Sequence, residues 1–327
     1  MRAIVAEQPG GPEVLQLVDR PVPTPGAGQA LVQVAYTSLN PLDTHGRAMR
    51  VEWNAPAFPF TPGYEYVGRV TAVGAGVDVG LIDQRVSVVG QWGGCADYAL
   101  ADAARVHPVP PAFSWQLGAV YFTTAYSAWH VLHTAGRLKS GDHVLLHSAA
   151  GALGTMMSQI AREAGATVYG LCGSADKVAF AQAFGAHHLI DSSAVDPVAT
   201  VLALSGGRGV DLIIDGVAGP EAPRNFAMLA PLGQVIYVGA VNGTPPTVDI
   251  SRQLYAKSIA VRGFVVYVAM AQTKGAELPA IHEALATGRW TIPITAVFDL
   301  AETAEVHRRF EARALRGRTL IRCGGDL

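Results

Sequence analysis

The sequence of 327 residues contains few cysteines and few charged residues. Its three cysteines, Cys95, Cys172 and Cys323, are too few and too far apart for a disulfide framework or a four-cysteine zinc site. Charged residues make up 15%, and 24 Lys and Arg against 26 Asp and Glu leave a formal charge of -2. The chain therefore lacks the net cationic field that binds nucleic acid or an anionic membrane, and any anion site must be local.

Long apolar runs are also absent. Gly, Pro, His or charged residues interrupt each apolar stretch before the roughly 18 residues that a membrane span needs. The apolar run within residues 1–7 is too short for the core of a signal peptide. Because the cysteine content also suits a reducing compartment, we expect a cytoplasmic protein.

The residues that are present predict two domains. Hydrophobic residues make up 50%, which is enough for substantial cores. Up to about residue 110, Val-rich strands broken by Pro and Gly indicate a mostly β domain. From about residue 115, helical segments alternate with apolar strands, which is typical of a doubly wound parallel sheet. The expected strands are 143–147, 167–171, 187–190, 210–214, 234–238 and 259–261.

After about residue 265 this alternation ends. We therefore expect the tail to rejoin the first domain, so that the nucleotide domain is an insertion and a cleft lies at the junction. The predicted fold class is α/β, with a Rossmann domain at residues 120–264 inserted into a mostly β domain formed by residues 1–119 and 265–327.

A glycine turn within residues 141–154 carries the most specific motif. An apolar strand runs into this turn, and Ala149, Gly151 and Gly154 occupy the three positions of a G-x-G-x-x-G pattern. Gly151 allows a pyrophosphate to approach the backbone, Gly154 allows close packing of the helix, and the helix N-terminus supplies N–H donors. We therefore prefer a dinucleotide site to an ordinary strand–helix turn. Its predicted contacts are Ala150, Gly151, Ala152, Leu153 and Gly154.

The end of the next strand favours NADPH over NADH. Leu171-Cys172-Gly173-Ser174 lacks the acid that would bind a ribose 2'-hydroxyl. Ser174 can donate a hydrogen bond to a 2'-phosphate, and Lys177 can supply a positive charge. The alternative is that Lys177 only pairs with Asp176 on a solvated helix face.

Several motifs together resemble the zinc-independent, zeta-crystallin-like quinone oxidoreductases of the medium-chain dehydrogenase/reductase superfamily. They are Ser38-Leu39-Asn40-Pro41-Leu42-Asp43, Pro59-Phe60-Thr61-Pro62-Gly63-Tyr64-Glu65-Tyr66-Val67-Gly68, Thr124-Ala125-Tyr126, the glycine turn and Gly317-Arg318. The resemblance covers essentially the whole chain. It implies a GroES-like catalytic domain, NADPH as cofactor, and a homodimer formed through edge strands near residues 259–268.

The resemblance also implies a set of site residues. Asn40, Asp43 and Thr124 would line the nicotinamide and substrate site, although Asn-Pro-x-Asp is also an ordinary turn sequence. Further cofactor contacts would be Gly173, Ser174, Lys177, Gly239, Ala240, Val241, Phe264, Val265 and Arg313. Ser192, also a predicted contact, stands where relatives bind the 2'-phosphate with tyrosine.

Zinc-dependent relatives place Cys, His and Cys where this chain has Asn40, Tyr64 and Val120. We therefore expect no metal site. Without zinc the hydride acceptor must already be electrophilic, as quinones and α,β-unsaturated carbonyls are. His45 and Tyr64 are candidate proton donors, unless water protonates the product and both merely shape the pocket.

These features predict an NADPH-dependent reductase that transfers a hydride to a small-molecule quinone. The alternative within the same class is a 2-alkenal or enoyl reductase. A hypothesis from another class is a non-catalytic dinucleotide-binding or sensor protein. No nucleic acid or membrane partner is expected.

Overall fold

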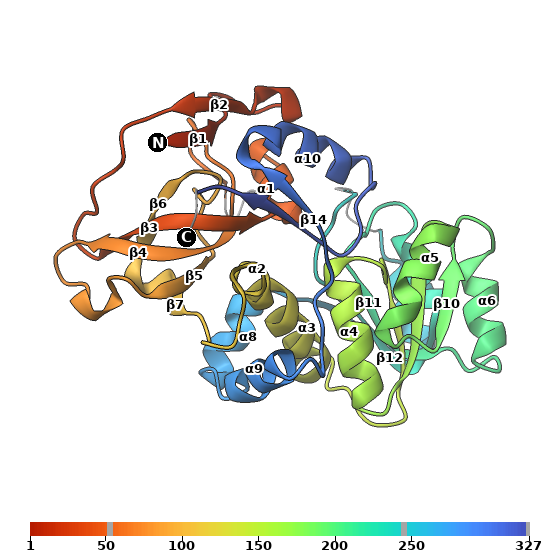
Figure 1. Cartoon of the computed structure of the whole chain (residues 1–327). Helices are drawn as coiled ribbons and strands as arrows, with labels where there is room; N and C mark the ends of the chain where they lie inside the picture. Colours follow the sequence, from red (N-terminus) through yellow and green to blue (C-terminus); the bar gives the residue numbers. More distant parts are fainter. Residues whose placement is uncertain (51–54, 243–246, 325–327) are drawn as a thin grey trace. The chain divides into compact units, whose positions relative to one another are not determined.

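A computed structural model describes residues 1–50, 55–242 and 247–324 (Figure 1). The chain divides into two compact units. The first unit comprises Met1–Thr123 and Ile294–Leu327, and the second comprises Thr124–Pro293. Among the residues with described structure, no helix combines the length and apolar character needed to cross a bilayer.

The first unit is built on a mostly antiparallel sheet of seven strands with the order β14-β15-β3-β4-β5-β7, in which β6 also pairs with β3. Its strands are β3 (Gln29–Ser38), β4 (Glu65–Val73), β5 (Arg85–Val89), β6 (Tyr98–Asp102), β7 (Val106–Pro108), β14 (Ile294–Asp299) and β15 (Arg318–Arg322). Besides these, β1 (Arg2–Val5) pairs with β2 (Gln16–Asp19), and the helices are α1 (Pro41–Arg47), α2 (Trp115–Gly118) and α10 (Thr303–Glu311). Strand β15 pairs antiparallel with β3, so the end of the chain belongs to the sheet formed by its beginning.

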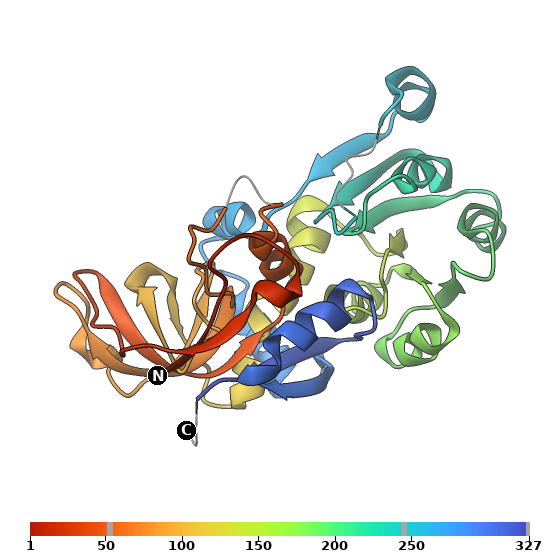
Figure 2. The ribbon, with the colours of Figure 1, turned by 90° about the horizontal axis from the view of Figure 1, so that it is seen from above.

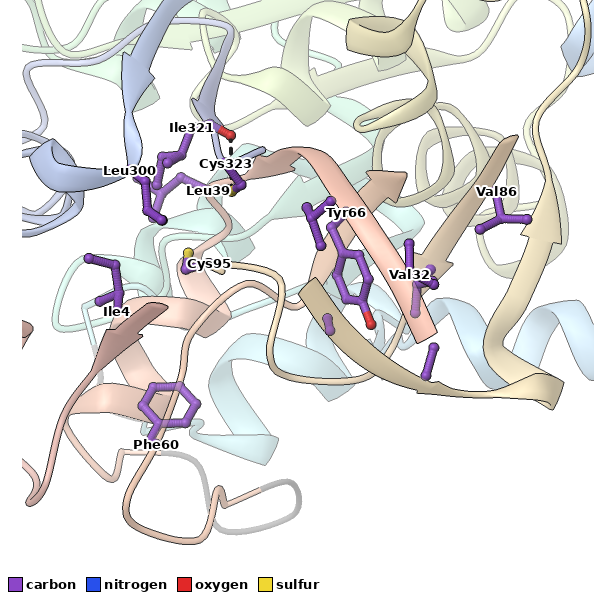
Figure 3. Close-up of a cluster of buried hydrophobic side chains, with 14 of the residues drawn as sticks. Ile4, Val32, Leu39, Phe60, Tyr66, Val86, Cys95, Leu300, Ile321 and Cys323 are labelled. Atoms are coloured by element: carbon purple, nitrogen blue, oxygen red, sulfur yellow. Dashed lines mark hydrogen bonds between the residues drawn. The ribbon is translucent and has the colours of Figure 1, made fainter. Parts of the chain in front are cut away.

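The core of the first unit is formed by apolar side chains that recur at every second position of these strands. Val32 and Val34 of β3 and Val86 and Val88 of β5 are fully buried. They share one cluster with Ile321 of β15 and with the other side chains in Figure 3. Successive strand residues point to opposite faces, so valines two residues apart pack on the same side of the sheet.

The second unit holds a six-stranded parallel sheet with the order β10-β9-β8-β11-β12-β13. Its strands are β8 (His143–Leu146), β9 (Thr167–Cys172), β10 (His188–Asp191), β11 (Val210–Asp215), β12 (Leu229–Tyr237) and β13 (Ala260–Gly263). Its helices include α3 (Ser127–His130), α4 (Ala152–Glu163), α5 (Ala175–Ala181), α6 (Pro197–Leu204), α7 (Asn225–Met228), α8 (Val266–Thr273) and α9 (Leu278–Ala286). The predicted α/β class with a doubly wound sheet is confirmed, and the strand order reverses between β8 and β11.

The return of the chain to the first unit lies at Ile294 and not at the predicted residue 265. Helices α8 and α9 pack within the second unit instead. The Nε2 of His130 in α3 lies 3.0 Å from Glu277 Oε1, immediately before α9. Trp290 donates a 2.6 Å hydrogen bond to Glu163 at the end of α4. These two contacts attach residues 266–293 to helices α3 and α4 of the second unit.

Candidate functional site

Asn40 and Asp43 adopt the geometry of a helix start. Asn40 has an extended backbone and precedes α1, and Pro41 takes the first helical position, where a missing N–H costs nothing. The Asp43 carboxylate accepts a 2.8 Å hydrogen bond from the backbone N–H of Asn40. This contact is half of a capping box, so the Asn-Pro-x-Asp sequence fixes the local structure before any chemistry is considered.

Asp43 also anchors the turn at Gly63 and Tyr64. Its Oδ1 accepts hydrogen bonds from the N–H groups of Gly63 (2.8 Å) and Tyr64 (3.1 Å), and its side chain is fully buried. Burial raises the pKa of Asp43 to about 6, although the three N–H donors act in the opposite direction. All of these partners are backbone groups, so the geometry gives Asp43 a positioning role.

We expect Asp43→Asn to remove a pH-dependent part of the stability. The pKa of Asp43 in the folded state lies above its ordinary 3.8, so this group stabilises the fold below about pH 4 and loses that effect as the pH rises through about 6. The difference between these two pKa values corresponds to roughly 3 kcal/mol. Urea unfolding of the wild type and of Asp43→Asn between about pH 4 and pH 7 measures this pH-dependent difference in stability.

Asp78→Asn is the matched control, because Asp78 also caps a helical turn but is exposed. At neutral pH, Asp43→Asn should also lower the free energy of unfolding by about 1–2 kcal/mol, because the NH2 group of the new Asn side chain would face the N–H of Asn40. Parallel pH profiles for the wild type and the Asp43 variant would contradict the assigned pKa.

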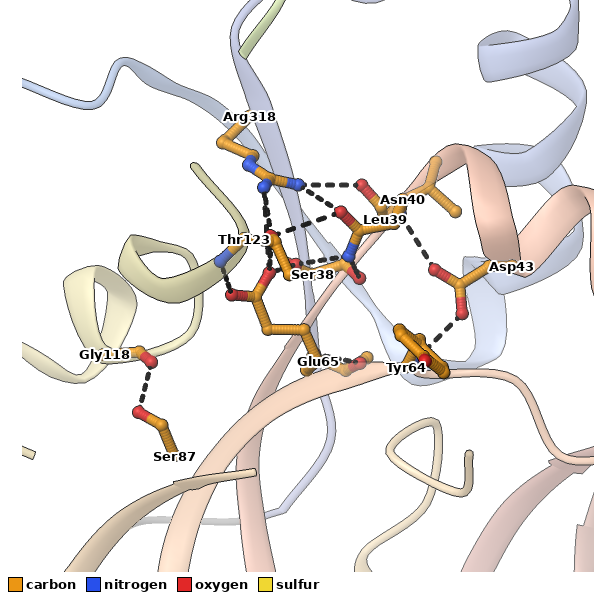
Figure 4. Close-up of polar contacts among 11 residues, drawn as sticks. Ser38, Leu39, Asn40, Asp43, Tyr64, Glu65, Ser87, Gly118, Thr123 and Arg318 are labelled. Atoms are coloured by element: carbon orange, nitrogen blue, oxygen red, sulfur yellow. Dashed lines mark hydrogen bonds and ion pairs between the residues drawn. The ribbon is translucent and has the colours of Figure 1, made fainter. Parts of the chain in front are cut away.

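A buried ionic cluster surrounds Asn40 (Figure 4). Arg318, the first residue of β15, donates to Asn40 Oδ1 at 2.7 Å and to Thr123 Oγ1 at 2.5 Å. Its Nη2 lies 3.7 Å from Glu65 Oε2. Burial lowers the pKa of Arg318, while the carboxylates of Glu65 and Asp43 raise it. Asn40 completes the cluster by donating from Nδ2 to the carbonyl and the hydroxyl of Ser38.

Glu65 supplies the negative charge of this cluster and is fully buried. Its carboxylate accepts hydrogen bonds from the Ser38 hydroxyl at 2.7 Å and from the Thr123 N–H at 2.8 Å. The Thr123 hydroxyl also donates to it. The sequence analysis proposed none of Glu65, Arg318 and Thr123 as a site residue, although Glu65 and Arg318 belong to motifs of the family resemblance. One signal for Arg318 was available, because it belongs to the Gly317-Arg318 motif of the family resemblance.

Tyr64 lies beside a hollow in the first unit. Its ring centroid is 4.6 Å from that of Trp92, which in turn lies 5.1 Å from Phe60. The hollow has a volume of about 250 Å³ and is lined by Pro56, Ala57, Pro59, Phe60, Thr61, Trp92 and Gly93. Its aromatic walls suit a flat apolar molecule.

His45 is the predicted catalytic residue that the structure does not join to the others. It follows Asp43 by two residues in α1, and residues two apart point to different sides of a helix. Burial lowers the pKa of His45, and the charges that act on it are those of Arg50 and Glu311. Asn40, Asp43 and Tyr64 are linked by hydrogen bonds, and His45 lies outside that group.

Across residues 1–50, 55–242 and 247–324, no three His, Cys, Asp or Glu side chains lie together as a possible metal-ligand group. The Asn40 amide is held by Arg318 and Ser38, as described above. The expectation of a metal-free site stays a prediction.

The glycine turn of the second unit has the geometry of a phosphate cradle. Ser148 has a positive φ of 52°, and the N–H of Gly151 donates to Ser148 O at 2.8 Å. Gly151 precedes α4 and has no side chain with which to cap it. The first N–H groups of a helix have no acceptor within the helix, so those of Ala152, Leu153 and Gly154 suit a pyrophosphate. The turn therefore fits a dinucleotide.

Gly154 and Gly173 differ in the space around them. A Cβ on Gly154 would lie 2.4 Å from Ser148 O and 2.7 Å from Ala149 Cα, so only glycine allows α4 to pack against the turn. A Cβ on Gly173, directly after β9, would meet no atom within 4 Å. Gly154 is thus required by the fold, whereas Gly173 faces open space.

Two predicted hydroxyl contacts already have partners in the protein. Ser174 donates to Asp176 at 2.5 Å, and Ser192 donates to the carbonyl of Cys172 at 3.0 Å. Lys177 lies in α5, three residues after Ser174. Asp176 therefore brings a negative charge beside Ser174. The sequence analysis considered Asp176 only as a partner of Lys177.

The remaining predicted cofactor residues divide between the units. Gly239, Ala240 and Val241 follow β12, and Val241 N–H bonds the carbonyl of Gly216 after β11. Phe264 and Val265 follow β13, so both groups lie at the carboxyl edge of the sheet, where nucleotides bind in such folds. Buried Thr124 opens the second unit, and Arg313 belongs to the first.

Comparisons with known proteins cover nearly all of the chain. Residues 26–111 match the alcohol dehydrogenase GroES-like domain, and residues 152–283 match the zinc-binding dehydrogenase family. A quinone oxidoreductase of Pongo abelii is 30% identical over 94% of this chain and 93% of its own. A mycobacterial structure in complex with NADPH is 27% identical, with a TM-score of 0.90 over 98% of this chain and 100% of that one. A 2-haloacrylate reductase structure is 26% identical, with a TM-score of 0.84 over 99% of this chain and 100% of that one.

Proposed function

Because the chain belongs to the zinc-independent quinone oxidoreductase branch of the medium-chain dehydrogenase/reductase superfamily, we propose that it is an NADPH-dependent reductase that transfers a hydride to a quinone. The observation that carries this proposal is the glycine turn at the start of α4, in a chain similar over 94% of its length to a quinone oxidoreductase. We place the protein in the cytoplasm, since its three cysteines are free thiols.

NADPH supplies the hydride when it is bound. In the second unit, the N–H groups of Ala152, Leu153 and Gly154 bind its pyrophosphate, and Lys177 stabilises the 2'-phosphate. In the first unit, Trp92 and Phe60 offer aromatic surface to a planar acceptor. Tyr64 is the candidate for a hydrogen bond to the charge that develops on the acceptor oxygen. The Asn40 amide is held by Ser38 and Arg318 and shapes the site.

A second acceptor class has its own support. The similar 2-haloacrylate reductase reduces, by its name, an unsaturated acid. An α,β-unsaturated carbonyl takes a hydride at its β-carbon and places negative charge on oxygen, as a quinone does, so the same hydrogen-bond donor would serve both.

Steady-state oxidation of NADPH separates the candidates. Purified protein is mixed with NADPH and with 1,4-benzoquinone, with a 2-alkenal or without acceptor, and the loss of nicotinamide absorbance is followed. The proposal expects the highest kcat/KM with the quinone. A higher value with the alkenal would assign the enone class. Tight NADPH binding without turnover of either acceptor would favour a binding or sensor protein.

Lys177→Gln should impair the use of NADPH specifically. Loss of a charge-assisted hydrogen bond costs about 1.5–3 kcal/mol, so we expect the KM for NADPH to rise by at least about tenfold. The KM for NADH should stay unchanged, because NADH lacks the 2'-phosphate. Lys139→Gln, an exposed lysine before β8 in the same unit, is the control. An equal effect on both cofactors would contradict the role of Lys177.

We also propose a homodimer that forms through β13. This strand is the last in its sheet, and all four of its residues are exposed. Figure 2 shows β13 and the helical turns at residues 250–257 extending from the second unit. Their exposed apolar residues include Val261 (42%) and Tyr255 (83%). An unpaired edge of this kind is a template for a second copy.

Sedimentation velocity should give the mass of a dimer for the wild type. Val261→Asp should shift it to the monomer, because the substitution places like charges near the symmetry axis. Val195→Asp, at an equally exposed valine of the same unit, should leave the dimer intact. A monomeric wild type would refute this assembly.

A further inference from the structure

Polar side chains lie at the carboxyl ends of two adjacent strands in the middle of the parallel sheet. Ile213 and Ile214 of β11 stand opposite Leu145 and Leu146 of β8, so the next residues, Asp215 and His147, stand side by side. Strand side chains alternate between faces, so His147 and Asp215 lie on the face that buries Leu145 and Ile213. This edge of the sheet is where nucleotides bind in such folds.

Asn225, the first residue of α7, bridges the two side chains. His147 Nε2 lies 2.8 Å from Asn225 Oδ1, and Asn225 Nδ2 donates to Asp215 Oδ2 at 2.8 Å. A carboxylate only accepts hydrogen bonds, so the amide NH2 must face Asp215 and the amide oxygen must face His147. His147 therefore donates from Nε2. Asn225 and Asp215 are fully buried, so the order of donors is fixed from His147 through Asn225 to Asp215.

This network joins three loops at the carboxyl edge. His147 directly precedes Ser148, which opens the glycine turn. Asp215 Oδ1 accepts hydrogen bonds from the N–H groups of Val217 (2.7 Å) and Ala218 (3.0 Å), which shapes the loop after β11. That loop in turn holds the one after β12, because Gly216 O accepts from the N–H of Val241 at 3.2 Å.

We infer that His147, Asn225 and Asp215 are positioning residues that hold the glycine turn and the loops after β11 and β12 in the conformation that receives the dinucleotide. This inference rests on the proposed function, since those loops are the proposed cofactor contacts. Backbone N–H groups bind a phosphate well only when other residues hold their loops in the right conformation. None of the three side chains needs to contact the cofactor to have this effect.

Substitutions of His147 test the network. His147→Phe keeps the ring but leaves the buried Asn225 oxygen without a donor, whereas His147→Gln returns an N–H donor. His143→Phe is the matched control. His143 begins the same strand, at the opposite edge of the sheet, and its Nδ1 lies 3.0 Å from the Tyr169 hydroxyl. The control variant therefore also loses one side-chain hydrogen bond. All four proteins are compared by NADPH titration and by amide hydrogen exchange without cofactor.

We expect His147→Phe to raise the Kd for NADPH about tenfold and to speed exchange at Gly151, Val217 and Ala218. His147→Gln should restore most of both properties. His143→Phe should lower the melting temperature as much as His147→Phe does. It should leave the Kd for NADPH and the exchange rates of these amides unchanged. Equal Kd values and equal exchange for the two Phe variants would overturn the inference. If the wild type binds no NADPH, the proposed function fails, and exchange alone then decides whether His147 fixes the loops.

Discussion

Arg318→Met should lower the free energy of unfolding by about 3–5 kcal/mol, the usual result of leaving a buried charge without its partner. Glu65 is fully buried, and Arg318 is the cation of its cluster, 3.7 Å away. Removing the guanidinium also takes a hydrogen bond from Asn40 Oδ1 and another from Thr123 Oγ1. Urea unfolding at neutral pH measures the loss.

Arg322→Met is the control for this prediction. Arg322 ends the same strand and pairs with Asp299 at 2.6 Å, but both side chains are exposed (58% and 61%). Its loss should cost no more than about 1 kcal/mol. Adding Glu65→Gln to Arg318→Met should recover part of the loss, because the uncompensated charge is then gone. Equal effects at Arg318 and Arg322 would show that the buried cluster contributes little.

Gly154→Ala should lower both the stability and the affinity for the cofactor. In an unobstructed helix this change would stabilise by about 1 kcal/mol. Here the new Cβ meets Ser148 O at 2.4 Å, and backbone cannot rotate away as a side chain can. We expect a loss of about 1–3 kcal/mol in the free energy of unfolding. Displacing α4 from the turn should raise the Kd for NADPH by at least about tenfold, which corresponds to 1.4 kcal/mol.

Gly173→Ala separates the two effects. Its Cβ would enter open space, so the free energy of unfolding should stay the same, while the Kd for NADPH should rise if the cofactor passes close to this backbone. Thermal melts and fluorescence titrations of both variants provide the comparison. A Gly154→Ala protein with unchanged stability would refute the packing argument.

Local patterns explain why most of the fold was predictable. Apolar strands separated by helical segments indicated the parallel sheet, and predicted strand 143–147 corresponds to β8 at His143–Leu146. The return point at Ile294 was not predictable in this way. Helices α8 and α9 break the alternation, and contacts between residues far apart in the sequence hold them to the second unit, such as that of His130 with Glu277, 147 residues apart.

The same distinction applies to the site. Asn40 and Asp43 are close in sequence, and their capping geometry is a local property. Arg318 is 278 residues from Asn40, so no spacing could place its guanidinium on that amide. His45 shows the converse, because it is near Asp43 in sequence, yet the charges that act on it are those of Arg50 and Glu311. Its role as a proton donor stays a prediction.

The buried cysteines bear on how the protein would survive its own substrates. Quinones and unsaturated carbonyls alkylate thiolates, and the thiolate is the reactive form of cysteine. Cys95, Cys172 and Cys323 are all buried, and burial raises the pKa of each thiol, that of Cys323 to about 12. Under the proposed function, an enzyme that turns over electrophiles therefore presents them with no accessible nucleophilic sulfur, and self-inactivation during catalysis should be slow.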